Sequence, residues 1–395
     1  MNIVQIEDYF HPDAGYQINI LSKYMVKLGH KVTIITSEMN KIPEPLVSFF
    51  GCQNIIDCDK EYTKLTKVEI YRLPLIGFVS GRAIFTNEIY KVIKKLDPDV
   101  LYIHGNDTLT AMRILMKIKK LSYPIIMDSH MLEMASVNKF NKMFKIFYKT
   151  FFAPKIIKNM IPIIRTQDDS YVEKYLGIPL IQCPWISVGS DTTLFHPDKC
   201  VRKEFRATFN ICEDDFVVIY TGKLEESKGG MFLAKTFQKK FDFHRRIVLL
   251  VVGNINGEYG ERVLQTFDKS ENVILKLPTQ KYKNLPMYYQ MSDLSIFPKQ
   301  CSLSFYDAQA CGLPVVSENN NINKDRLKYN NGFTFRSGDS IDLRDKIMKC
   351  VEMNNSSFKE MGNNAVKFVI ENFDYENIAR QYLEIILNKY RMFHS

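Results

Sequence analysis

The sequence lacks the short patterns that mark metal-binding, redox and P-loop proteins. Its eight cysteines include no Cys-x-x-Cys pair and no cluster with histidine, so scattered reduced thiols are expected rather than disulfides or a zinc site. The Gly-x-x-x-x-Gly-Lys-Ser/Thr spacing of a P-loop is missing. The longest apolar runs, such as 247–252, are far too short to span a bilayer. No dense arginine stripe or RNA-binding motif is present, which argues against nucleic acid as a partner.

The composition is that of a folded protein with a mild excess of positive charge. A chain of 395 residues that is 46% apolar has room for about two to three domains, each with a buried core. The net charge is +9; up to Ile186 there are 24 of the 53 basic and 18 of the 44 acidic residues, which leaves 29 and 26 after it. This balance fits phosphorylated ligands or an anionic membrane surface. Because Met1 runs directly into a strand without a secretory signal, we expect a cytoplasmic protein.

Apolar strands alternate with amphipathic helical stretches along the whole chain. This alternation predicts an α/β fold with parallel sheets and right-handed crossovers. We expect an N-terminal domain over 1–186, a turn-rich linker over 187–200, a C-terminal domain over 201–373 and a final helix over 374–395. Two such halves would place a ligand cleft at the carboxyl ends of their strands. The expected strands include 2–6, 31–37, 99–105, 124–130, 161–166, 181–186, 216–222, 246–253, 272–276 and 294–298, and one expected helix covers 82–96.

The segment 220–230 reads YTGKLEESKGG, a buried strand followed by a glycine turn and two lysines. A glycine at position 222 lets the backbone approach a ligand, and the flexible lysines Lys223 and Lys228 supply positive charge for a phosphate group. The alternative is that these lysines are solvated side chains of an ordinary loop.

A second polar segment interrupts the apolar pattern at 297–317, which reads FPKQCSLSFYDAQACGLPVVS. Backbone N–H groups at the start of the expected helix, together with Ser302 and Ser304, could bind phosphate oxygens. Asp307, one turn further, could accept two hydrogen bonds from a ribose diol. Together with the lysines these residues predict a nucleotide-diphosphate site. The alternative for the serines is ordinary helix capping.

These segments resemble the donor domain of the GT-B glycosyltransferases, in particular the large retaining family 4. The resemblance is carried by the segment 220–230, by LPMYYQMSDLSIFP (285–298) and by YDAQACGLPVV (306–316). The linker VGSDTTLFHPD (188–198) is similar to the connector of that family, and HPDAGYQ (11–17) matches its N-terminal half more loosely. The resemblance implies two Rossmann-like α/β domains facing across a cleft, with the C-terminal helix returning to the N-terminal domain.

The same resemblance implies roles for individual residues of the second half. Lys223, which stands where the family usually has arginine, and Lys228 would hold the diphosphate and assist its departure. Asp307 would hold the ribose. Lys299 stands where the first acid of the family's motif is expected, so recognition of the sugar would differ from the usual pattern. The donor-binding set would also include Gly222, Ser302, Leu303 and Ser304.

In the first half, His130 at the end of PIIMDSH matches the catalytic histidine of the family's N-terminal domain. It could hydrogen-bond the transferred sugar and stabilise developing charge, and Asp128 could orient it. A structural role for His130 is the alternative, and His104 is a second candidate. Gly15 would let the backbone approach the donor's phosphate. The family's pattern needs no metal or cofactor, and the leaving diphosphate would itself accept the proton of the acceptor.

The segment 138–158 reads NKFNKMFKIFYKTFFAPKIIK and combines a basic with an aromatic face. Its lysines, Lys139, Lys142, Lys145 and Lys149, and its phenylalanines, Phe140, Phe144, Phe147 and Phe151, recur at helical spacing. This pattern is typical of a helix that lies on an anionic membrane surface. The alternative is a core helix with a solvated basic rim.

We therefore predict a retaining glycosyltransferase that moves a hexosyl group from a nucleotide-diphosphate sugar to a saccharide acceptor. The acceptor could be lipid-linked, with the enzyme on the inner face of the membrane in polysaccharide or glycan synthesis. A nucleotide-sugar epimerase of the same fold is less favoured, because no paired catalytic acids can be placed. A degenerate, non-catalytic partner subunit is the other alternative, since the first motif acid is missing.

Overall fold

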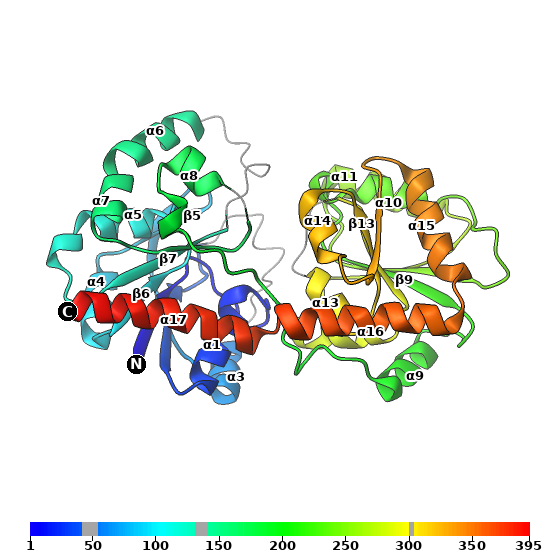
Figure 1. Cartoon of the computed structure of the whole chain (residues 1–395), viewed down its shortest axis with the longest axis horizontal. Coiled ribbons are helices and arrows are strands. Elements are labelled where there is room, and N and C mark those ends of the chain that lie inside the picture. Colours follow the sequence, from blue (N-terminus) through cyan, green and yellow to red (C-terminus); the bar gives the residue numbers. More distant parts are fainter. Residues whose placement is uncertain (42–53, 131–140, 169, 300–303) are drawn as a thin grey trace. The chain divides into compact units, whose positions relative to one another are not determined.

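The computed structural model describes residues 1–41, 54–130, 141–168, 170–299 and 304–395. Internal contacts divide the chain into two compact units. Unit 1 comprises Met1–Val188 and Tyr375–Ser395, and unit 2 comprises Gly189–Asp374. Each unit is built on its own six-stranded parallel sheet (Figure 1). The predicted class, two parallel-sheet α/β domains, is therefore confirmed.

The sheet of unit 1 has the strand order β3-β2-β1-β6-β7-β8. All five pairings between these neighbours are parallel. The short hairpin β4-β5 is antiparallel and lies outside the main sheet. The strands are β1 (Asn2–Ile6), β2 (Lys31–Ser37), β3 (Glu69–Leu73), β4 (Leu75–Val79), β5 (Arg82–Phe85), β6 (Val100–Ile103), β7 (Ile125–Ser129) and β8 (Ile163–Arg165).

Side chains of the central strands alternate between two buried faces. Val4, Leu101 and Met127 belong to one hydrophobic cluster that includes residues of the helices α4 to α8. The residues of opposite parity, such as Tyr102, point to the other face, which α1 and α17 cover. The helices of unit 1 are α1 (Gln17–Lys27), α3 (Ile55–Thr66), α4 (Glu88–Leu96), α5 (Leu109–Met116), α6 (Asn141–Phe151), α7 (Ala153–Lys158), α8 (Tyr171–Leu176) and α17 (Tyr375–His394).

The C-terminal helix α17 belongs to unit 1, as the resemblance implied. It packs along α1, and Figure 1 shows it (red) crossing the strands of that unit. Its side chains Ile378, Tyr382 and Ile386 are buried at helical spacing. At its outer end the Lys389 ammonium donates a hydrogen bond to the Asn159 carbonyl at 2.7 Å.

The sheet of unit 2 has the corresponding order β11-β10-β9-β12-β13-β14, again with parallel pairings throughout. Every residue of β9 and β10 is buried, as expected for central strands covered on both faces. The strands are β9 (Phe216–Thr221), β10 (Ile247–Val252), β11 (Val273–Leu277), β12 (Leu294–Phe297), β13 (Val315–Glu318) and β14 (Gly332–Phe335).

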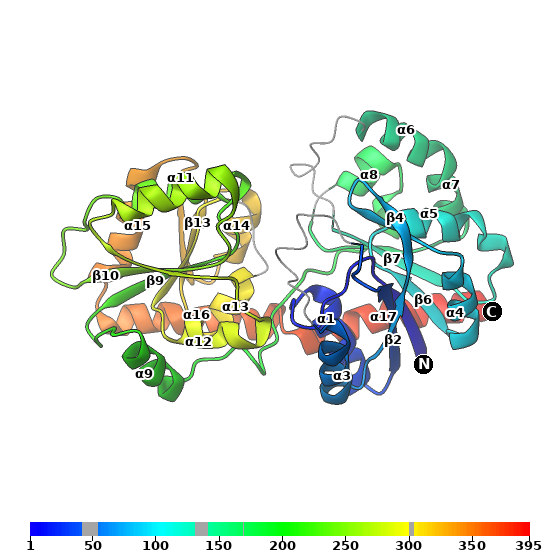
Figure 2. The same cartoon turned by 180° about the vertical axis from the view of Figure 1, so that it is seen from behind.

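Two layers of helices cover the sheet of unit 2. The helices α10, α11 and α15 pack together on one side, and α13 packs against α16 on the other, where α9 and α12 also lie (Figure 2). The helices are α9 (Lys199–Thr208), α10 (Gly230–Thr236), α11 (Gly257–Asp268), α12 (Leu285–Gln290), α13 (Ser304–Ala310), α14 (Asn321–Arg326), α15 (Ser340–Glu352) and α16 (Asn355–Asn372).

Two local predictions for unit 1 are wrong. The expected strand over 181–186 is instead a 3-10 turn, Leu180–Gln182, followed by a single bridge between Trp185 and Arg165. The expected helix over 82–96 begins at Glu88, because its first residues form β5 of the hairpin. A turn through Ser80 and Gly81, both with positive φ, joins the two hairpin strands. Within the described residues, none of the helices combines the length and apolarity that crossing a membrane requires.

Candidate active site

The strand order of each sheet reverses direction at one place, and ligands of α/β proteins bind at such switch points. In unit 1 the reversal lies between β1 and β6, and in unit 2 between β9 and β12. The segments that follow these strands contain most of the predicted site residues. His104 and His130 follow the strands β6 and β7 of unit 1, and Lys223 and Lys299 follow the strands β9 and β12 of unit 2.

In unit 2 the turn after β9 is built around a close approach of two glycines. Gly222 has φ of 141°, a conformation that side chains rarely adopt. Gly253, at the end of β10, lies so close that a Cβ atom there would be 1.9 Å from the Gly222 carbonyl oxygen. The two glycines therefore fix the backbone of the segment that carries Lys223.

Three lysines come from two neighbouring loops at this edge of the sheet. Lys223 and Lys228 lie before and within the 3-10 turn Glu226–Lys228, and both are half-buried. The Lys299 ammonium, from the loop after β12, donates to the Glu226 carbonyl at 3.3 Å. A Cβ atom on Gly229 would lie 3.3 Å from the Cβ atom of Lys299, so the two loops are in contact. The Lys223 ammonium is 3.7 Å from the Glu225 carboxylate.

Asp307 in α13 is nearly fully buried and is held by two hydroxyl groups. The Ser190 hydroxyl donates to Asp307 Oδ1 at 2.7 Å, and the Tyr282 hydroxyl donates to the same oxygen at 3.4 Å. Ser190 lies on the segment that enters unit 2, and its backbone N–H donates to Phe373 at the segment that leaves it. Burial raises the pKa of Asp307 to about 7, and the neighbouring Asp191 adds to the shift.

Of the other predicted residues in this loop, the structure describes only Ser304. Ser304 is the first residue of α13 and is half-buried. Ser302 and Leu303 lie outside the described residues.

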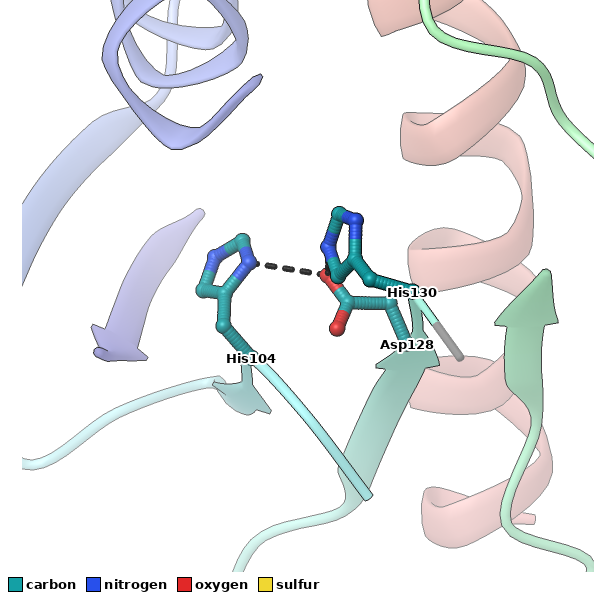
Figure 3. A group of neighbouring side chains, drawn as sticks. All are labelled: His104, Asp128 and His130. Atoms are coloured by element: carbon teal, nitrogen blue, oxygen red, sulfur yellow. Dashed lines mark ion pairs between the residues drawn. The ribbon is translucent and has the colours of Figure 1, made fainter. Parts of the chain in front are cut away.

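In unit 1 one buried carboxylate lies between two imidazole rings (Figure 3). Asp128 Oδ2 is 2.8 Å from His104 Nδ1 and 3.4 Å from His130 Nε2. The Tyr102 hydroxyl donates to the same oxygen at 2.6 Å, and the Gly105 N–H donates to Oδ1 at 2.7 Å. Asp128 lies in β7, and His130 directly follows the strand, two positions later. Because side chains alternate along a strand, both lie on the face that α1 and α17 cover.

The electrostatics of this cluster follow from one buried negative charge. Burial alone would raise the pKa of Asp128, but the two imidazoles outweigh it and hold that pKa well below its usual range. Desolvation lowers the pKa of His130, but the Asp128 carboxylate reverses the effect, so the net shift is upward. The His130 ring is 47% exposed, whereas Asp128 is fully buried.

The three side chains also bring ligand atoms within 4.8 Å of one another, the spacing of a possible cation site. Both oxygens of Asp128 already accept hydrogen bonds, and His104 Nε2 lies 2.7 Å from the Gln5 side-chain oxygen. These three side chains therefore fit a hydrogen-bonded network better than a metal centre.

Comparison with known proteins places both units in one family. The family model described as "Glycosyl transferases group 1" matches residues 201–388, and the model described as "Glycosyltransferase Family 4" matches residues 14–157. The two matches cover most of unit 2 and most of unit 1. The chain is a family 4, group 1 glycosyltransferase.

Relatives of this glycosyltransferase are distant in sequence. A probable sucrose-phosphate synthase of Thermosipho melanesiensis is 23% identical over 412 aligned positions, which cover 95% of this chain and 91% of that protein. The lipopolysaccharide 1,2-N-acetylglucosaminetransferase of Salmonella typhimurium is 25% identical over 198 aligned positions, which cover 46% of this chain and 51% of that protein.

Solved structures confirm the GT-B fold of the glycosyltransferase. A glycosyltransferase from Rickettsia africae superimposes with a TM-score of 0.76 at 17% identity, and the match covers 100% of this chain and 98% of that one. Anabaena Alr3699/HepE, solved in complex with UDP and glucose, gives a TM-score of 0.72 at 16% identity, with 97% and 98% covered.

The structure of the glycosyltransferase brings several predicted residues together and adds others. Gly222, Lys223, Lys228 and Lys299 lie at one edge of unit 2, whereas Asp307 is tied to the entering segment. Gly15 has φ of 64° two residues before α1.

Sequence reasoning missed three residues around His130. Glu7 interacts electrostatically with both histidines, the Tyr102 hydroxyl donates to Asp128, and the Tyr382 ring packs beside Tyr102. A polar residue inside an otherwise apolar strand, such as Gln5 in NIVQI, was the available signal for this network.

Proposed function

We propose that this glycosyltransferase transfers a hexosyl group, with retention of anomeric configuration, from a nucleotide-diphosphate sugar to a saccharide acceptor. The observation that carries the proposal is the position of Lys223, Lys228 and Lys299 on two loops that contact each other at the switch point of unit 2. Positive charge at this place suits a diphosphate leaving group. Asp307 would accept hydrogen bonds from the ribose, and His130 of unit 1 would bind the transferred sugar.

The proposed chemistry needs electrostatic stabilisation more than an enzyme nucleophile. Negative charge grows on the diphosphate as the glycosidic bond to it breaks, and the lysines neutralise that charge. The departing phosphate oxygen takes the proton of the acceptor hydroxyl, which attacks the same face of the sugar. Neither a metal nor another cofactor is part of this proposal. The relatives that are named for sugar transfer and the UDP complex of Anabaena Alr3699/HepE support the donor class.

A panel of nucleoside diphosphates tests the donor class directly. We expect one of UDP, ADP, GDP or CDP to raise the unfolding temperature by about 5–10 °C at a hundred times its Kd, because binding to the native state adds about 2.7 kcal/mol. The corresponding nucleotide sugar should be hydrolysed slowly without an acceptor. Binding without hydrolysis or transfer would instead favour a non-catalytic partner subunit, and no shift with any diphosphate would contradict the proposed donor site.

We further propose that the acceptor is lipid-linked and that the enzyme works at the cytoplasmic face of an anionic membrane, in polysaccharide or glycan synthesis. Support comes from α6, whose outer side exposes Met143 (72%), Ile146 (67%), Phe147 (46%) and Phe151 (55%). We call these four residues the α6 apolar face. Single exposed apolar residues are common, but four on one helix face are the pattern of an interaction surface.

The charges around the α6 apolar face favour lipid over a protein partner. The sequence from Asn141 to Gln167 contains no acidic residue, whereas Lys142, Lys155 and Lys158 are among its basic ones. An apolar stripe flanked by lysines and free of acids is complementary to anionic headgroups.

The aromatic and basic faces predicted from the sequence are only partly exposed in the structure, because some of their residues contact other parts of unit 1. Phe144 turns inward and packs against the core near Tyr148. The Lys145 ammonium lies 3.7 Å from the Tyr175 ring centroid, and the Lys149 ammonium donates to the Lys174 carbonyl. Lys139 and Phe140 lie outside the described residues.

Vesicle flotation tests the membrane contact. The double substitution Phe147→Ser/Phe151→Ser should lower binding to vesicles rich in phosphatidylglycerol about tenfold or more, because two aromatic side chains lose their apolar environment. Binding of the parent protein should also weaken with added salt. The control Leu65→Ser/Met116→Ser removes two apolar residues elsewhere in unit 1 that are even more exposed, at 72% and 70%, and should change little. Equal binding by both double variants, or none by the parent, would contradict the proposal, and hydrolysis of the soluble donor should be unaffected.

A further inference from the structure

The surroundings of His130 include a buried group of polar side chains that extends to the C-terminal helix. The Gln17 side-chain amide of α1 donates to the Tyr382 hydroxyl of α17 at 2.5 Å. The Tyr382 ring packs beside the Tyr102 ring, and the two ring centroids are 6.2 Å apart. Because the Tyr102 hydroxyl already donates its proton to Asp128, a hydrogen bond between the two phenols requires Tyr382 to donate to the Tyr102 oxygen.

We propose that Asp128 is a positioning residue that anchors His130 Nε2, and that Tyr382 of the C-terminal helix holds this carboxylate in place through Tyr102. Tyr102, His104 and His130 all contact the same Asp128 oxygen, Oδ2, while the Gly105 N–H donates to Oδ1, so both oxygens of the carboxylate are held. The kinetic part of this inference rests on the proposed sugar transfer, whereas the geometric part does not.

The geometry leaves the second nitrogen of His130 for the substrate. His130 Nδ1 lies 3.4 Å from the Thr166 hydroxyl, a long contact that a sugar hydroxyl or phosphate oxygen could replace. The Thr166 hydroxyl also lies 3.2 Å from the Ser129 carbonyl, so it does not depend on His130. With Nε2 held by Asp128, a doubly protonated ring can present its Nδ1–H from a fixed position.

The charge of His130 depends on every titratable group that faces it. Asp128 on β7 contributes most, and Glu7 after β1 and Asp107 after β6 act in the same direction. His104 contacts the same carboxylate from β6, and Arg82 is paired with Asp107 at 2.6 Å. Burial lowers the pKa of His130, but the Asp128 carboxylate more than offsets it, so the ring stays protonated to a higher pH than an isolated histidine.

The ring titration of His130, followed by NMR, tests the anchor without any substrate. The parent has seven histidines, and a His130→Gln variant identifies the signal. We expect the pKa of His130 to fall on Asp128→Asn, which keeps the shape of the side chain and removes its charge. Tyr382→Phe, which removes one hydroxyl, should lower it less. Ile386→Val, a buried change on the same helix outside this group of polar side chains, should lower the unfolding temperature and leave the titration unchanged.

Kinetics then separate a positioning role from general damage to the fold. We expect Tyr382→Phe to lower kcat about three- to tenfold with an unchanged KM for the donor, and to move the alkaline limb of the pH profile to lower pH. An unchanged His130 titration in both Asp128→Asn and Tyr382→Phe would overturn the inference, as would an equal effect of Ile386→Val. If the titration moves as expected but the parent transfers no sugar, the anchor stands and the proposed function fails.

Discussion

Replacing Lys228 with alanine is expected to lower kcat/KM for the nucleotide sugar by about 10²–10³-fold, which corresponds to about 2.7–4 kcal/mol of transition-state stabilisation. The loss should appear mainly in kcat, because charge on the diphosphate is greatest as the bond to the sugar breaks. Lys223→Ala should have an effect of similar size. Lys299→Ala should lower kcat/KM less, because the Lys299 ammonium already donates a hydrogen bond to the Glu226 carbonyl. Steady-state kinetics with the donor identified by the nucleotide panel provide the measurement.

The matched control for these variants is Lys235→Ala. Lys235 is an exposed lysine in α10, the helix that follows Gly229, so its removal changes the net charge of unit 2 by the same amount. We expect kcat/KM of this variant to stay within about twofold of the parent. Comparable losses in Lys228→Ala and Lys235→Ala would show that general charge matters and that the three-lysine edge does not form the site.

Replacing Asp307 with asparagine is expected to stabilise the free protein, and more so at higher pH. The pKa of Asp307 is about 7 in the folded state and 3.8 in an ordinary aspartate, so the folded state binds the proton more tightly than the unfolded one. The stability from this proton is complete below pH 3.8 and is lost as the pH rises to about 7. Asparagine does not ionise, so the gain of Asp307→Asn over the parent should grow by about 2–3 kcal/mol between pH 5 and pH 8.

Denaturant unfolding at the two pH values gives this difference, and a second acid supplies a control of opposite sign. The pKa of Asp342 is lowered, chiefly because the Arg336 backbone N–H donates to it, so Asp342→Asn should destabilise the protein at neutral pH. The same Asp307→Asn substitution should weaken nucleotide binding if the carboxylate accepts the ribose hydroxyls. A pH-independent effect of Asp307→Asn on stability would refute the buried ionisation, and unchanged nucleotide affinity would refute the ribose contact.

The two sheets were predictable because their central strands are fully buried. Runs such as 216–220 and 247–252 are continuously apolar, and helical stretches separate them, which favours parallel strands with crossovers. The hairpin β4-β5 was missed because its residues are partly exposed and its second strand was read as the start of a helix. The segment 181–186 is apolar without being a strand, as periodicity alone does not distinguish the two in short runs.

The candidate site was predictable to the extent that strand ends meet at one edge. Asp128 lies in β7 and His130 directly follows it, two positions away, so their proximity follows from the alternation of side chains along a strand. Lys223 and Lys228 lie in one loop. The contact of Ser190 with Asp307 joins residues 117 positions apart, and that of Gln17 with Tyr382 joins residues 365 positions apart. Such contacts depend on the packing of complete helices, and no local pattern encodes them.

Isothermal titration of the preferred nucleoside diphosphate into the parent, Lys228→Glu/Asp307→Asn and Lys235→Glu proteins tests the central claim most directly. If the lysine edge of unit 2 binds the diphosphate and Asp307 the ribose, the double variant loses at least a hundredfold in affinity, about 2.7 kcal/mol, whereas Lys235→Glu binds like the parent. An affinity of the folded double variant equal to that of the parent would contradict the account.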